Sequence, residues 1–100
     1  MDLSDKPYWF KVVDFLQQNW AVISTEAGMA KVIFFSDTCG IFDELTFPSS
    51  TEAESALRRN GFNTYDDDVE AQKLIRRPVG TFRPVPHPNG PIYSSGRFWR

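Results

Sequence analysis

The stretch AVISTEAGMAKVIFFS, residues 21–36, decides the fold class of this 100-residue chain. Both of its ends are rich in Val, Ile and Phe, and the triplet at 26–28 between them is typical of a hairpin turn. We therefore predict antiparallel strands at Ala21–Thr25 and Ala30–Ser36, with a third strand after the next turn, at Ile41–Phe47. The second strand is apolar on both faces, which indicates a central strand or one that is covered on both sides.

The clearest local signature follows the third strand. The spacing Ser49-x-x-Glu52, or equally Thr51-x-x-Glu54, matches a capping box, in which hydroxyl and carboxylate satisfy the first free amides of a helix. Gly61 suits the left-handed position that ends a helix. The sequence therefore predicts a helix that begins at this box and stops before the glycine.

A short third helix is predicted over Val69–Ile75. Three aspartates at 66–68 precede it, and Arg76 and Arg77 follow it. Acids at the N-terminus of a helix and cations at its C-terminus complement the helix dipole. Between the second and third helices, Asn63–Tyr65 is predicted to be a short extended piece.

The first 20 residues have the spacing of a helix. Apolar residues recur there every three or four positions, which is typical of one helix face: Trp9, Val12, Val13, Leu16 and Trp20. Ser4 or Asp5 can cap such a helix, and Pro7 falls near its first turn, where a missing N–H costs nothing. We predict a helix from about Asp5 to Asn19. Phe10 projects toward its polar side and hints at a second packing surface.

These elements predict an α+β fold in the order α-β-β-β-α-α. Helices pack mainly on one face of a three-stranded antiparallel meander in a domain of residues 1–77. An extended, proline-rich C-terminal arm, residues 78–100, docks on the same domain. Double-stranded-RNA-binding domains share the order helix, three strands, helix, but they grip phosphates with a basic cluster where the second helix starts. The corresponding segment here, Ser49–Glu54, is acidic, so we do not assign the chain to that family.

The near-neutral net charge of −2 conceals two halves of opposite sign. Residues 1–75 hold all 13 acidic residues and six basic ones, a net charge of −7, whereas residues 76–100 hold five arginines and no acid, a net charge of +5. The total therefore gives no general attraction to nucleic acid or anionic membrane. No apolar run approaches the roughly 20 residues of a membrane span. With one cysteine and no signal peptide, we expect a reducing, cytoplasmic setting.

The arm is the leading candidate for a binding site, through its cationic and aromatic residues Arg83, His87, Tyr93, Arg97, Phe98, Trp99 and Arg100. We expect a small non-enzymatic protein-interaction or regulatory module whose partner is another protein or a second copy of the chain. Nucleic-acid binding is the alternative, because cations alternate with aromatics over residues 96–100, as in proteins that stack single strands. The net charge of −7 on the rest of the chain would repel a polyanion over about 8–10 Å.

An enzyme is the second alternative. Cys39 and His87 are the only thiol and the only imidazole, and the two could form a nucleophile–base pair. Nothing in their spacing supports this, and the aspartates at 66–68 lack the alternation of a calcium-binding loop. The glycines show no phosphate-binding spacing. We therefore predict no catalytic residue, no metal site and no cofactor.

Overall fold

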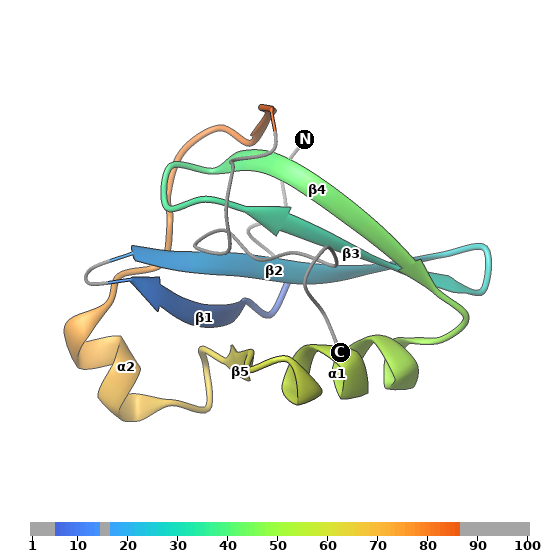
Figure 1. Cartoon of the computed structure of the whole chain (residues 1–100), viewed down its shortest axis with the longest axis horizontal. Helices are drawn as coiled ribbons and strands as arrows, with labels where there is room; N and C mark the ends of the chain where they lie inside the picture. The colour runs from blue at the N-terminus through green and yellow to red at the C-terminus, as the bar shows by residue number, and fades with distance from the viewer. Residues whose placement is uncertain (1–5, 15–16, 87–100) are drawn as a thin grey trace.

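The described part of the chain is a six-stranded mixed sheet with two short helices (Figure 1). The computed structural model describes residues 6–14 and 17–86. Its elements are β1 (Trp9–Asp14), β2 (Gln17–Glu26), β3 (Met29–Phe35), β4 (Gly40–Phe47), α1 (Ser50–Arg59), β5 (Asn63–Thr64), α2 (Val69–Leu74) and β6 (Arg83–Pro84). The strand order is β5-β1-β2-β3-β4-β6, and every pair is antiparallel except β4 with β6. This small mixed architecture replaces the predicted α-β-β-β-α-α meander.

The predicted first helix, Asp5–Asn19, is wrong. Its described residues form β1 and the start of β2, which pair antiparallel with Trp9 opposite Ala21 and Phe10 opposite Trp20. The apolar spacing was ambiguous because the sheet is buried on both faces, so apolar residues occupy neighbouring positions as well as alternate ones. Tyr8 and Phe10 point to one face and Trp9 to the other, and all three are buried.

Helices do not gather on one face of the sheet, which also corrects the predicted packing. α1 covers the face that we call the Trp9 face, where the core consists of Trp9, Ala21, Ala30, Val32, Phe34, Phe42, Ala53, Leu57 and Phe62. α2 contributes Ala71 to the opposite, Trp20 face. The core there consists of Tyr8, Phe10, Trp20, Val22, Ile33, Phe35, Cys39, Ile41, Tyr65, Ala71 and Phe82. The sheet is therefore the middle layer of the core.

The hairpin that decides the fold is present. β2 and β3 are joined by a two-residue turn in which Ala27 and Gly28 both have positive φ, at 52° and 79°, a geometry that matches the twist of an antiparallel pair. β3 is central, and its residues Val32, Ile33, Phe34 and Phe35 are buried on both faces. The predictions of these two strands, and of the strand at β4, are confirmed.

α1 begins and ends as its sequence predicts. The Ser49 hydroxyl accepts the N–H of Glu52 at 3.2 Å, so the first of the two possible capping pairs is used. At the other end Gly61 has φ +93°, and the Phe62 N–H donates to the Leu57 carbonyl at 2.9 Å. This Schellman ending turns Phe62 back into the core. α2 and the short extended piece at β5 are likewise present.

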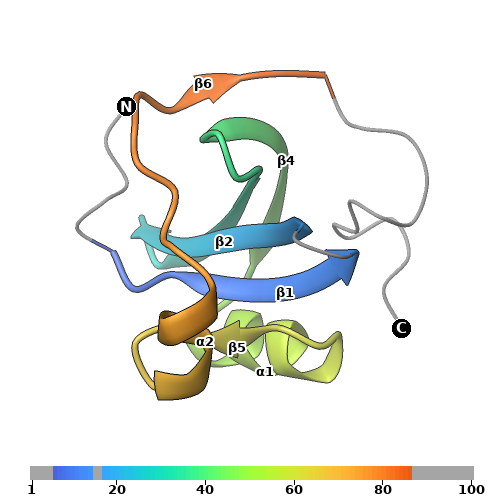
Figure 2. The same cartoon turned by 90° about the vertical axis from the view of Figure 1, so that its left-hand side faces the viewer.

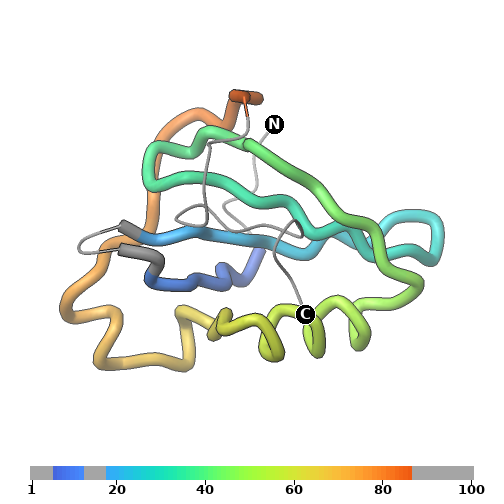
Figure 3. The backbone as a smooth tube through the Cα atoms, in the orientation of Figure 1, coloured from blue at the N-terminus to red at the C-terminus, as the bar shows by residue number. Residues whose placement is uncertain are grey.

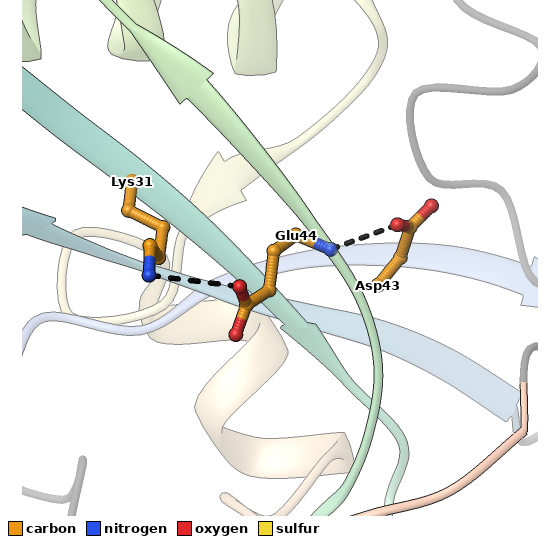
Figure 4. Close-up of polar contacts among 3 residues, drawn as sticks. All are labelled: Lys31, Asp43 and Glu44. Atoms are coloured by element: carbon orange, nitrogen blue, oxygen red, sulfur yellow. Dashed lines mark hydrogen bonds and ion pairs between the residues drawn. The ribbon is translucent and has the colours of Figure 1, made fainter.

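The edge of the sheet at β4 and β6 offers few free hydrogen-bond donors. β6 pairs only with Gly40 and Ile41 of β4, and Phe42 is then the extra residue of a bulge. Beyond the bulge, the Asp43 carboxylate accepts the backbone N–H of Glu44 at 2.8 Å, while Lys31 pairs with Glu44 at 3.6 Å (Figure 4). A charged side chain thus occupies a donor that an incoming strand would need.

Candidate protein-interaction surface

Three adjoining hollows surround β5, at the opposite edge of the sheet. α1, β5 and α2 follow one another along the chain beneath β1, as Figures 2 and 3 show. The hollow between β1 and α2, which we call the edge groove, has a volume of about 440 Å³. The hollow between β1, β2 and α1, which we call the Trp9 pocket, has a volume of about 480 Å³. A smaller hollow of about 170 Å³ shares residues with both and links them past Thr64.

The edge groove combines a buried floor with exposed aliphatic side chains. Its lining is Phe10, Lys11, Val12, Gly61, Asn63, Asp68, Glu70, Ala71, Leu74 and Ile75. Val12 is 56% exposed and Leu74 is 84% exposed, although both are large apolar side chains. Ile75 packs against the Trp20-face core and is half-buried. Two exposed aliphatic groups beside one groove form the kind of apolar patch that a partner covers.

The groove also lies along an open stretch of β1. β5 pairs with β1 only at Trp9 and Phe10, and the Tyr65 N–H donates to the Tyr8 carbonyl at 2.9 Å. Within the described residues no strand pairs with the outer side of β1 after Phe10. Alternate residues of a strand direct their backbone groups to the same side. The N–H and C=O of Val12 therefore face outward, as those of Tyr8 and Phe10 do.

The Trp9 pocket has an apolar floor and a charged rim. Its lining is Pro7, Trp9, Ile23, Thr25, Ser50, Glu54, Arg58, Thr64, Asp66 and Asp67. The guanidinium carbon of Arg58 stands 5.0 Å from the centre of the Trp9 ring, in cation–π geometry, and an Arg58 nitrogen lies 3.7 Å from the Glu54 carboxylate. Thr64 donates its hydroxyl to Asp67 at 2.7 Å, which holds that carboxylate beside β5.

Carboxylates outnumber cations around the three hollows. Their linings together contain the five acids Glu54, Asp66, Asp67, Asp68 and Glu70, but only the two cations Lys11 and Arg58. Asp68 also caps α2 by accepting the Ala71 N–H at 3.0 Å. Glu70 forms an exposed pair with Lys73 at 3.6 Å, so together with the Glu54–Arg58 pair two of the five charges are offset. The surface around β5 therefore favours a cationic partner.

The structure places only one of the predicted binding residues. Arg83 lies exposed on β6, where its backbone N–H donates to the Cys39 carbonyl at 3.2 Å. β6 is at the other edge of the sheet from β5, so Arg83 takes no part in the hollows. The other predicted residues, His87, Tyr93, Arg97, Phe98, Trp99 and Arg100, lie outside the described residues.

Cys39 is buried in the Trp20-face core, in a turn where its φ is +64°. Burial raises the pKa of its thiol, and the nearby Arg83 guanidinium lowers it by a smaller amount. A raised pKa keeps the thiol protonated, whereas the thiolate is the nucleophile. His87, the residue that the enzyme alternative pairs with Cys39, lies outside the described residues.

The described residues contain no group of three or more His, Cys, Asp or Glu side chains that could hold a metal ion. Neither helix in the described part of the chain is long and apolar enough to cross a membrane. No protein-family model matches the sequence, and neither the characterised proteins nor the solved structures include a significant match.

Sequence reasoning assigned Trp9 and Val12 to the core face of a helix and so missed the surface around β5. A signal was present in the run Tyr8–Val13, where aromatic and β-branched residues, which favour strands, occupy five of the six positions. Residue type at these positions was a better guide than spacing.

Proposed function

We propose that the protein is a small interaction module that binds a protein partner in the edge groove. The observation that supports this is the exposure of Val12 and Leu74 beside the stretch of β1 that no described strand covers. A reducing, cytoplasmic location, for which the single cysteine is the ground, belongs to the same proposal.

An extended segment of the partner fits this groove in a physically simple way. Its backbone adds to the outer side of β1 at Val12, which supplies hydrogen bonds, and its side chains pack against Leu74 and Ile75. Fully burying a side chain such as Leu contributes about 1.5–3 kcal/mol. Two such anchors and the pair of backbone hydrogen bonds at Val12 contribute about 4–9 kcal/mol before the costs of association, so we expect weak binding, closer to millimolar than to micromolar.

The test is a selection of peptides from a random displayed library against the full chain, followed by binding measurements with the purified peptides. Leu74→Asp should weaken the selected peptides at least tenfold, because an unpaired carboxylate in an apolar contact is costly. Val79→Asp is the matched control, because Val79 is 88% exposed and lies outside the groove.

Methylation of peptide backbone nitrogens gives a second readout. In a strand added to β1, alternate N–H groups face β1, so methylation should abolish binding at one parity and leave it intact at the other. The proposal fails when selected peptides bind Leu74→Asp as well as they bind the unchanged chain. It also fails when methylation weakens binding equally at the peptide positions whose N–H faces β1 and at the positions whose N–H faces away.

Nucleic-acid binding remains the alternative. It rests on arm residues outside the described part of the chain, and the carboxylates around β5 would repel phosphates there.

A further inference from the structure

We propose that the Trp9 pocket receives an arginine or lysine side chain from an extended, basic partner segment. The inference rests on the proposed function, since it names the chemistry of the partner that the interaction surface selects. It is carried by different residues from those of the edge groove. The two can therefore fail separately.

The pocket can contact both the aliphatic stem and the charged head of an arginine or lysine side chain. Pro7 and Ile23 provide apolar surface for an aliphatic stem, above the buried Trp9 ring that Arg58 covers. Around that surface stand Glu54, Asp66 and Asp67, three carboxylates that can accept hydrogen bonds from the charged head. A volume of about 480 Å³ leaves room for such a side chain beside the residues already present.

Arg58 already occupies this pocket as an internal cation. Its guanidinium covers the Trp9 ring at 5.0 Å and reaches Glu54 at 3.7 Å, contacts that an incoming arginine would make. The Arg58 side chain is nevertheless 60% exposed, and exposed ion pairs contribute only about 0–1 kcal/mol. Arg58 is therefore a weak occupant, and it both competes with a cationic ligand and repels it.

Removing the Arg58 cation should make the Trp9 pocket more accessible to a cationic ligand. Arg58→Gln should strengthen the binding of a basic peptide, because the internal competitor is gone and its carboxylate partner is released. Arg59→Gln is the matched control, because Arg59 lies in the same last turn of α1, is exposed, and changes the net charge equally. General electrostatics predicts the same effect for both variants, whereas the pocket predicts an effect of Arg58→Gln that is about threefold or more larger.

The experiment is an NMR titration of the full chain at low salt with an end-blocked pentapeptide of alternating arginine and valine. A peptide with citrulline in place of arginine has nearly the same shape without the charge. We expect the arginine peptide to shift the signals of Thr64, Asp66 and Asp67 and the indole N–H of Trp9. The combined variant Asp66→Asn and Asp67→Asn should weaken its binding at least threefold. Glu44→Gln, on β4 toward the other edge of the sheet, should have a smaller effect.

Equal binding of the citrulline peptide would overturn the inference, as would equal effects of Arg58→Gln and Arg59→Gln. Shifts confined to residues outside the pocket would also overturn it. The outcome for the proposed function is separate. Selected peptides that lack cations but lose affinity in Leu74→Asp would uphold the edge groove and reject the role proposed for the Trp9 pocket. An arginine peptide whose affinity Leu74→Asp does not change would uphold the Trp9 pocket and reject the edge groove.

Discussion

The hydrogen bond between Trp20 and Asp37 gives the sharpest test of the fold around which these sites are built. Trp20 is fully buried, and its ring lies 5.4 Å from that of Tyr65 and 5.9 Å from that of Tyr8. Its indole N–H donates to an oxygen of the exposed Asp37 carboxylate at 2.8 Å. This contact ties the β3–β4 turn to β2.

Asp37→Ala removes the acceptor and leaves the indole N–H without its partner. A hydrogen bond to a charged group contributes about 1.5–3 kcal/mol, and an orphaned buried donor costs about 1–3 kcal/mol. Because Asp37 is itself exposed, water can replace part of the contact, so we expect a loss of about 1–2 kcal/mol. For a chain of this length, each kcal/mol lowers Tm by about 4–8 °C.

Urea unfolding of four proteins measures this contact: the unchanged chain, Asp37→Ala, Trp20→Phe and the double variant. The coupling between the two substitutions should be about 1 kcal/mol, since Trp20→Phe has already removed the donor. Asp37→Asn is the control, because Asn retains an oxygen acceptor and suits the turn, so it should lose less than half as much. Additive single effects, or a change below about 0.5 kcal/mol for Asp37→Ala, would refute the reasoning.

Three further outcomes can be measured with the same methods. Gly61→Ala and Gly28→Ala should each destabilise the protein by about 1–2 kcal/mol, because both glycines have positive φ and the new Cβ at Gly61 would meet only the flexible end of Lys11; a change below about 0.5 kcal/mol at either position would contradict the strain. Gly40→Ala should cost about 1–3 kcal/mol and expose the backbone of Val85 to hydrogen exchange, because its Cβ would lie 3.1 Å from both Val85 methyl groups. Cys39 should react with a thiol reagent far more slowly in the native chain than in urea at pH 8, because burial raises its pKa; equal rates would show that it is accessible.

Local signals in the sequence were sufficient wherever neighbours in the chain determine the structure. The start of α1 depends on Ser49 and Glu52, and its end on Gly61, all within one short segment. The β2–β3 hairpin depends on its turn and on two adjacent strands. These elements could be predicted because their contacts join residues that are close together in the sequence.

The site could not be predicted in that way, because it depends on a pairing between distant segments. β1 and β5 meet through Tyr8–Phe10 and Asn63–Tyr65, more than 50 positions apart. Once β1 is misassigned to a helix, no edge exists for the groove to follow. The same misassignment placed Val12 in a core, although its side chain is more than half exposed.

The two edges of the sheet differ in what they offer another strand, and this difference explains why binding belongs at β1. On β6, Arg83 and Val85 direct their N–H groups to the carbonyls of Cys39 and Ile41. Pro84 and Pro86 occupy the alternate positions, where a backbone N–H would face outward, and proline has none. That edge can accept hydrogen bonds but donates few. At β1 the outward residue is Val12, which has both groups and lies among exposed aliphatic side chains. A partner strand therefore finds a backbone donor as well as an acceptor at β1, with the exposed Leu74 beside them, whereas β6 offers acceptors alone.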